Sequence, residues 1–289
     1  MDLIWQKFTD WLKEVLVGGV MDNLTGLFDT VNTRVGEIAG QVGTTPQGWN
    51  SGIYNMIRSI SDNVILPIAG IILAVVMTME LIQIITDKNN MHDVDTWFMF
   101  KWVFKTACAV LIVSNTWNIV MGVFEVAQSV VNSASGVIVG NVNIDLASNI
   151  ADLESRLNEM EVWSLLGLWL QSFVVKFTMN ALNICIFIII YGRMIEIYLV
   201  TSVAPIPMAT AINREWGQMG QNYLRSLFAL GFQGFMILIC VGIYAVLVQN
   251  MVVDTDISKA IWGCMGYTVL LCFTLFKTGS LAKSVFNSH

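Results

Sequence analysis

Long apolar stretches separated by short polar ones run along most of the chain. A helix that crosses a lipid bilayer needs about 20 mainly apolar residues. Stretches of this kind lie near residues 64–86, 102–124, 162–203, 226–253 and 259–277. The fourth of them contains no charged residue at all. The pattern predicts an all-α polytopic membrane protein with about five transmembrane helices.

The third stretch raises the question of a sixth crossing, because apolar sequence continues almost unbroken from 162 to 212. No strong turn signal divides it before Pro205, so one long helix is favoured over two crossings. Pro205 removes a backbone donor and disfavours helical geometry at Ala204, and Pro207 repeats the effect. We therefore expect the helix to end near the prolines, with a sixth span as the alternative.

The N-terminal residues show a helical period of a different kind. Apolar residues face charged ones across the predicted helix, and they include Trp5, Phe8, Trp11 and Leu12. Tryptophans on such a face suit a membrane interface. A glycine-rich break at 40–52 follows, so we predict an amphipathic arm over 1–60 and a transmembrane domain over 61–289. The arm either packs on its own bundle or contacts neighbouring subunits or lipid.

Composition agrees with a membrane protein. Of the 289 residues, 55% are hydrophobic and 12% are charged, whereas soluble domains carry about 25% charged residues. The five cysteines all fall within apolar stretches, which argues against a disulfide framework or a metal site. Only two histidines occur, and no predicted span contains an aspartate. The sequence therefore predicts no enzyme and no cofactor.

The distribution of positive charge predicts an orientation, because short cytoplasmic loops are rich in Lys and Arg. The segments 87–105 and 193–225 each hold three such residues. The acidic loop at 125–161 holds Arg156 alone beside six acidic residues. We therefore place the N-terminus and the acidic loop outside. The proline segment at 204–225 and the C-terminus then lie in the cytoplasm.

Charges inside apolar stretches indicate function by default. Glu80 and Lys105 lie near the ends of their spans, where long side chains can reach the interface. Lys176 depends on which part of the long helix lies in lipid. A crossing at 163–185 places it deep, where it needs a partner or a water-filled path. A crossing at 178–203 places it at the outer boundary.

The second of these crossings buries Arg193 and Glu196 instead. Their spacing of three residues puts them on one helical face, where they can pair. Glycines offer close packing of membrane helices. The candidate packing positions are Gly231 and Gly234 in the fourth span and Gly263 and Gly266 in the fifth.

Four segments carry a resemblance to a known family. They are VGTTPQGWN at 42–50, the stretch 95–124, the stretch 191–235 that begins YGRMIEIYLVTSVAPIPMA, and YTVLLCFTLFKTGSLAKSVFNSH at 267–289. These segments resemble the TrbL-like conjugal transfer membrane proteins, the polytopic inner-membrane subunits of type IV secretion systems. The form found on Gram-positive integrative conjugative elements is the most similar. The likeness covers nearly the whole chain.

The resemblance implies a channel or scaffold subunit that helps to translocate single-stranded DNA, with its relaxase, across the cytoplasmic membrane. It implies a homo-oligomer working in the lipid bilayer beside other type IV secretion subunits, including ATPases. On this basis the path or its cytoplasmic mouth is assigned, as a hypothesis, to Lys176, Arg193, Glu196, Pro205, Pro207, Arg214 and Arg225. Two alternatives stay open: a scaffold that assembles the ATPases without lining the path, and a small-solute or ion transporter.

Overall fold

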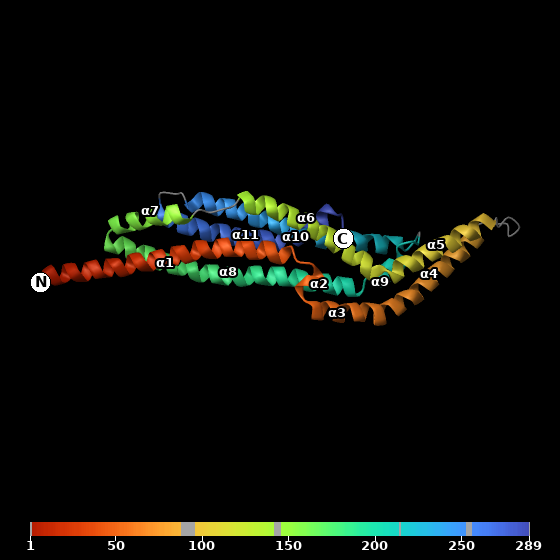
Figure 1. Ribbon diagram of the computed structural model, residues 1–289. Helices are drawn as coiled ribbons and strands as arrows, with labels where there is room; N and C mark the ends of the chain where they lie inside the picture. Colours follow the sequence, from red (N-terminus) through yellow and green to blue (C-terminus); the bar gives the residue numbers. More distant parts are fainter. Residues whose placement is uncertain (1, 88–95, 142–145, 214, 253–255, 289) are drawn as a thin grey trace. The chain divides into compact units, whose positions relative to one another are not determined.

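The computed structural model describes residues 2–87, 96–141, 146–213, 215–252 and 256–288 (Figure 1). Every element within these residues is a helix, which confirms the all-α prediction. The elements are α1 Asp2–Val42, α2 Pro46–Trp49, α3 Ser51–Ile60, a π-helical turn η1 Ser61–Ile65, α4 Leu66–Asp87, α5 Thr96–Ser114, α6 Thr116–Asn141, α7 Leu146–Glu159, α8 Val162–Ser202, α9 Pro205–Thr210, α10 Gly217–Val252 and α11 Ile257–Val285.

Five helical segments of the described chain are long and apolar enough to cross a membrane, as predicted. They are Ser51–Thr86, Trp97–Ser114, Val162–Ser202, Gly217–Gln249 and Ile257–Val285. The first begins earlier than expected, because α3 continues into α4 through the π-helical turn. The third is the single helix α8, so one long helix is confirmed in place of two crossings.

The second crossing differs from the predicted 102–124. The helix breaks at Asn115, and α5 ends at Ser114 before α6 begins. The Asn115 side chain donates to the carbonyl of Leu111 at 2.8 Å, and the Thr116 hydroxyl donates to that of Val113 at 2.8 Å. Such polar side chains compete for backbone groups and bend helices. The apolar residues beyond the break therefore belong to a separate helix.

The acidic segment at 125–161 is largely helical and not a loop. Helix α6 continues to Asn141, and α7 covers Leu146–Glu159. Apolar residues in α7 recur every three or four positions, which gives it one apolar face. That face packs on α1 and buries Leu157 completely. Acidic residues occupy other positions of α7, and this charge led to the prediction of a loop.

Helix α8 ends at Ser202, close to the predicted position. The predicted change of backbone geometry at Ala204, however, does not occur. Ala204 keeps right-handed helical angles, φ −50° and ψ −39°, although Pro205 follows it. What changes is the hydrogen bonding, because neither Pro205 nor Pro207 can donate. The amides of Ala204 and Ile206 bond three residues back, to Thr201 and Val203. The chain tightens at this point and then forms the short helix α9.

The contacts group the chain into two compact units that are interleaved along the sequence. The first contains Met1–Val42, Asn132–Ile190 and Met236–Thr278, and the second contains Gly43–Val131, Tyr191–Phe235 and Gly279–His289. Helices α6, α8, α10 and α11 contribute to both. These units describe packing and not position in a membrane. The predicted boundary at residue 60 between arm and membrane domain stays a prediction.

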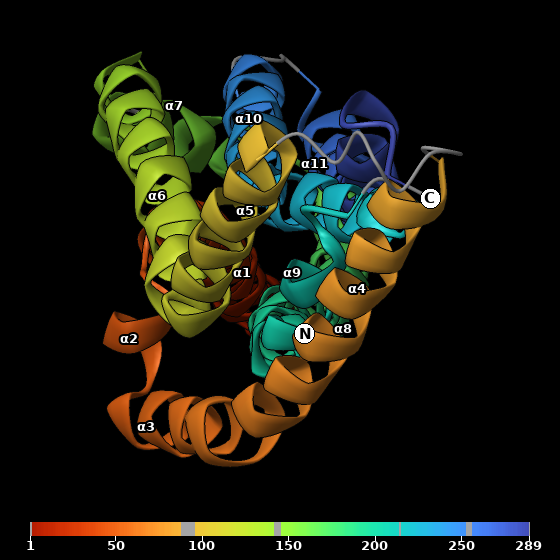
Figure 2. The ribbon, with the colours of Figure 1, turned by 90° about the vertical axis from the view of Figure 1, so that its right-hand side faces the viewer.

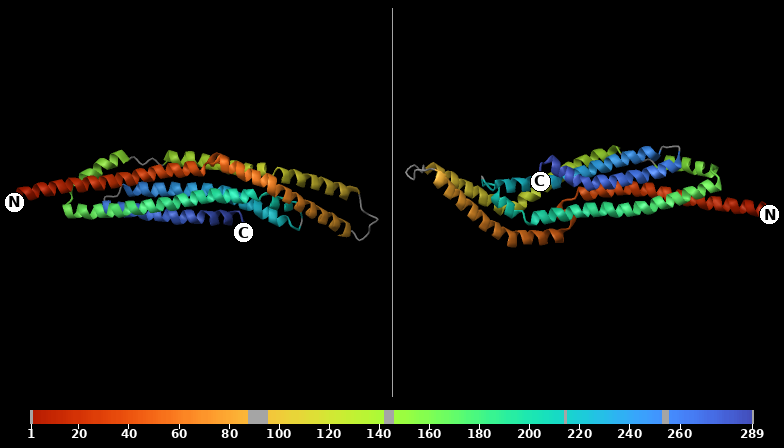
Figure 3. Two further views of the ribbon diagram at one scale, coloured as in Figure 1. Left: turned by 90° about the horizontal axis from the view of Figure 1, so that it is seen from below. Right: turned by 180° about the vertical axis from the view of Figure 1, so that it is seen from behind.

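In the first unit, α1 runs alongside the beginning of α8 (Figure 3). A Cβ at Gly19 would meet the Trp169 indole at 2.7 Å, and Asn23 bonds Ser172 at 3.0 Å. Residue numbers rise together, so the helices are parallel. Ser258 donates to the side chain of Gln171, and Cys272 donates to the carbonyl of Leu182. Residue numbers rise together here too, so α8 and α11 are also parallel. The third and fifth of five alternating crossings must share a direction.

In the second unit, α9 lies between α4 and α5 (Figure 2). Small and medium side chains make this contact close. The buried cluster consists of Ala69, Leu73 and Met77 from α4, Ala109 and Val113 from α5, and Ala209 from α9. The segment with the two prolines is therefore enclosed by its own chain and does not lie free on a membrane surface.

Candidate functional site

Arg193 is a buried cation within the membrane-spanning helix α8. Its side chain is 7% exposed. Nε and Nη2 both donate to the carbonyl of Leu230 at 3.4 Å, and Nη2 also donates to the carbonyl of Gly231 at 3.4 Å. Both acceptors are backbone oxygens of α10. Arg193 thus fastens α8 to α10 through long, weak contacts, and its burial is only partly compensated.

Glu196 does not supply the partner that its spacing suggests. Its carboxylate accepts from Lys283 of α11 at 3.4 Å, and both side chains are nearly half exposed. An exposed pair of this kind contributes at most about 1 kcal/mol. Arg193 and Glu196 therefore take different partners. Together they link α8 to both α10 and α11 within the second unit.

The predicted packing glycines fall in different surroundings. A Cβ at Gly231 would lie 2.9 Å from the Cβ of Ala127 in α6, so only glycine allows this approach. Gly234 is buried, and Gly263 is half-buried. Gly266 is exposed and has nothing within 4 Å of a Cβ position. One of these glycines thus marks a tight contact between α6 and α10.

A second charged site links α4, α5 and the segment after α9. Lys105 forms an ion pair and hydrogen bond with Glu80. Only 12% of the Glu80 side chain and 31% of the Lys105 side chain are exposed. The Trp102 indole donates to the carbonyl of Met77 at 3.0 Å beside them. Sequence reasoning assigned both charges to the membrane interface and missed the pair. The sequence signal for this pair was that Glu80 and Lys105 lie at similar distances along the chain from the polar stretch between the two apolar ones.

Asn213 joins this pair to the start of α10. Its amide nitrogen donates to the second carboxylate oxygen of Glu80 at 3.5 Å. Its amide oxygen accepts from the backbone amides of Glu215 and Trp216 at 2.8 and 3.0 Å. One buried asparagine therefore holds the linker between α9 and α10 against α4. We refer to Glu80, Lys105 and Asn213 as the hairpin clamp.

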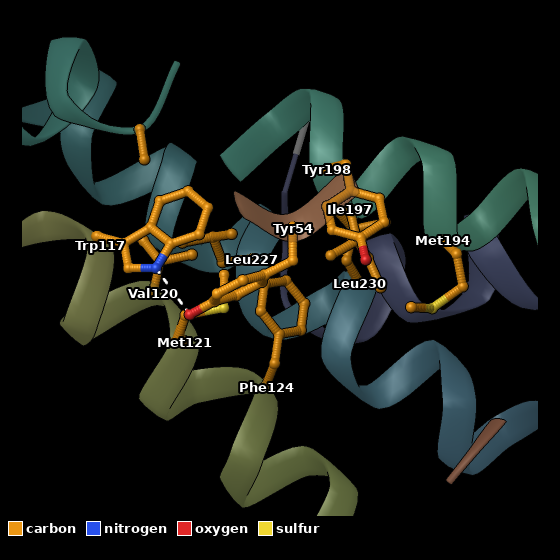
Figure 4. Packing of buried hydrophobic residues seen from close by; sticks show 11 residues of the cluster. Tyr54, Trp117, Val120, Met121, Phe124, Met194, Ile197, Tyr198, Leu227 and Leu230 are labelled. Carbon is orange, nitrogen blue, oxygen red and sulfur yellow. Dashed lines mark hydrogen bonds between the residues drawn. The ribbon is translucent and has the colours of Figure 1, made fainter. Parts of the chain in front are cut away.

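Aromatic side chains surround the N-terminal end of α3 (Figure 4). The Trp117 indole donates to the Tyr54 hydroxyl at 3.0 Å, and the rings meet edge to face. The Tyr198 hydroxyl donates to the carbonyl of Pro46 at 2.5 Å. Trp49 packs against both Tyr191 and Tyr198. The resembling segment at 42–50 is thus the point where α2 docks on α8.

The remaining predicted site residues are dispersed. Lys176 lies in the first unit and donates to Asn23 at 3.1 Å. Arg225 is exposed on α10, and Arg214 lies outside the described residues. In the arm, Phe8 and Trp11 are exposed and their rings are 5.9 Å apart, while Leu12 is half-buried. The Trp5 side chain lies outside the described part. Leu16 and Val20 of the same helix are buried, so this part of the arm packs on its own unit.

The described residues contain no group of three or more His, Cys, Asp or Glu that could hold a metal ion. The polar sites instead join helices to one another. These sites therefore hold apolar helices together through hydrogen bonds and ion pairs, some of which involve buried charges.

Fold and polar sites together define a multi-pass α-helical membrane protein whose helices are fastened by buried charges. The sequence model of the family described as "TrbL/VirB6 plasmid conjugal transfer like protein" matches residues 31–205, more than half of the chain. The chain belongs to this family, and so it is a membrane subunit of a conjugal transfer, type IV secretion, system. No curated protein and no solved structure matches it. The family match ends at Pro205, so the resemblance beyond that residue stays a prediction.

Proposed function

We propose that this subunit helps single-stranded DNA, with its attached relaxase, to cross the cytoplasmic membrane during conjugation. The observation that carries the proposal is membership of the conjugal transfer family over residues 31–205. Other subunits of the system, including its ATPases, are the partners. The N-terminus lies outside and the C-terminus in the cytoplasm, in accordance with the distribution of Lys and Arg.

The conduit is a homo-oligomer and not a single chain. Two buried apolar clusters join helices of one copy, one between α3, α6, α8 and α10 and one between α4, α5 and α9. Five crossing helices offer little room for a strand of DNA within a single chain. A ring of several copies can enclose a path between subunits, because polar residues inside a membrane usually face a bundle interior or water.

The cytoplasmic mouth of the path is assigned to Arg193, Glu196, Pro205, Pro207, Arg214 and Arg225. Burial of Arg193 and enclosure of α9 support a fixed structure at this point. Irregular backbone at membrane depth survives only when it is buried in protein or lines water. The two prolines thus shape the mouth, and Arg193 holds α8 and α10 around it.

Replacing Arg193 with alanine is expected to lower transfer frequency about tenfold, while the amount of protein in the membrane stays near normal. Hydrogen bonds from a charged group contribute about 1.5–3 kcal/mol, and the long contacts of Arg193 belong at the lower end of this range. A difference of about 1.4 kcal/mol corresponds to tenfold in an equilibrium. Arg58→Ala is the matched control, because Arg58 is half exposed and pairs with Asp62 one turn away. Unchanged transfer with Arg193→Ala at normal protein level would remove Arg193 from the mouth.

Formaldehyde crosslinking during active mating tests the function itself. The subunit is pulled down, and the transferred strand is amplified from the bound material. We expect transfer DNA to be recovered, and its recovery to disappear when the relaxase gene is deleted. If other subunits in the same lysate give DNA and this one does not, the protein is a scaffold for its partners and does not line the path.

A further inference from the structure

Helix α8 carries a row of polar side chains that includes Lys176 and lies apart from Arg193 and Glu196. Ser172, Lys176, Asn180 and Asn183 follow one another at intervals of four, four and three residues. Residues at such intervals lie on one face of a helix. We call this set the α8 polar stripe.

The beginning of the stripe is covered by α1. Ser172 is 3% exposed, and its hydroxyl accepts from the Asn23 amide nitrogen at 3.0 Å. The oxygen of the same amide accepts from Lys176 at 3.1 Å. Asn23 therefore meets both residues at once, and the stripe starts as a polar seam between α1 and α8.

The rest of the stripe has no partner within the described residues. Asn180 is exposed and Asn183 is half-buried, and neither side-chain amide forms a hydrogen bond there. The opposite face of the same stretch is apolar. Val174 and Ile188 are 50% and 57% exposed, as expected for side chains in contact with lipid. Val174 lies nine residues before Asn183 and Ile188 five residues after it, which places both on the other side of the helix.

The two asparagines lie near the middle of α8, which has 41 residues. About 20 residues suffice to cross the hydrocarbon, so most choices of crossing segment within α8 include both positions. An amide without a hydrogen-bond partner is costly in hydrocarbon. This face must therefore meet either water or polar groups of another chain in the assembled system.

We propose that the α8 polar stripe lines an aqueous route through the membrane, and that this route is the one taken by the transferred strand. The passage of the transferred strand along this route rests on the proposed function, whereas the aqueous lining does not. Water is favoured over a second copy because the Lys176 ammonium, an exposed group, has three donors and one hydrogen bond, and forms no ion pair within the described residues. Ammonium and amide N–H groups are also the donors that contact phosphate oxygens.

Cysteine labelling in cells that carry the complete transfer system tests the aqueous stripe. The five native cysteines are first replaced, and Asn180→Cys and Asn183→Cys are then compared with Val174→Cys and Ile188→Cys on the opposite face. A membrane-impermeant maleimide is expected to label the two stripe positions and to leave the two apolar positions unlabelled. Glu161→Cys, at an exposed residue just before α8, serves as the positive control.

Equal protection of all four α8 positions, with the control labelled, would overturn the proposal. Disulfide formation between copies through Asn183→Cys would also overturn it and would assign the stripe to an interface between subunits. Labelling of the stripe without recovery of DNA in the mating experiment would support the aqueous stripe. It would contradict only the proposal that the transferred strand takes this route. The two failures are therefore distinguishable.

A charge substitution gives a second readout that does not depend on labelling. Asn180→Asp is expected to leave the amount of protein in the membrane unchanged, because water solvates the carboxylate. Val174→Asp, on the opposite, apolar face, is expected to lower that amount, because a carboxylate in lipid is costly. Equal loss with both variants would contradict a water-facing stripe.

Discussion

Reversing the charge of Glu80 is expected to remove most folded protein from the membrane and to abolish transfer. Glu80→Lys places two ammonium groups in a site where the original carboxylate is 12% exposed. Breaking a buried ion pair costs about 3–5 kcal/mol, and partial exposure of Lys105 reduces this to about 2–4 kcal/mol. The measurement is the amount of protein in isolated membranes together with its thermal midpoint in detergent.

The double variant Glu80→Lys with Lys105→Glu is the control for this result. It restores an ion pair between α4 and α5 in the opposite sense, so most of the lost stability is expected to return. The hydrogen bond from Asn213 to Glu80 is the part of the hairpin clamp that the exchange does not restore. A double variant as unstable as Glu80→Lys alone would show that the pair does not hold the two helices together.

Gly220→Ala is expected to destabilise the contact between α9 and α10. A Cβ at this position would lie 2.5 Å from the Cα of Ala211 and 2.7 Å from the carbonyl oxygen of Pro207. Both neighbours are backbone atoms, so the chain must shift to make room. Overpacking of this kind costs about 1–3 kcal/mol. We expect a lower thermal midpoint and a lower transfer frequency.

Gly70→Ala provides the matched control for Gly220→Ala. Gly70 lies within α4 and has nothing within 4 Å of a Cβ position. Alanine is favoured over glycine inside a helix by roughly 0.5–1 kcal/mol. The same substitution is therefore expected to be neutral or slightly stabilising at this site. If both variants lost stability equally, the close approach at Gly220 would not be the cause.

Much of the fold was predictable because membrane-spanning helices depend on local composition. A helix satisfies its own backbone groups, so an apolar run of sufficient length is enough to predict a crossing. This holds for α8, α10 and α11. It fails at Asn115, where one apolar run divides into two helices and the Asn115 side chain bonds back to the preceding turn. It fails again at 125–161, where the many acidic residues suggest a loop. The segment contains helix α7, whose apolar face is explained only by its packing on α1.

The polar sites were predictable only in part. Arg193, Glu196 and Lys176 stand out because charges are rare in apolar stretches, and the structure gives each a hydrogen-bond partner. None of these partners lies within 30 residues along the chain. The pair of Glu80 and Lys105 shows the same limit, since each charge alone reads as an interfacial residue. Two helices must first be brought together before one side chain can be assigned to the other.

The sequence by itself determined the class of protein, the number of crossings and the family, because these follow from hydrophobic length, charge and motif along one chain. Only the tertiary structure decided which partner each charge takes and that α9 is enclosed by α4 and α5. It also decided that Asn180 and Asn183 have no hydrogen-bond partner among the described residues. The physical reason is that helix formation depends on neighbours in sequence. Burial and hydrogen bonding between side chains depend on which helices lie next to one another in space.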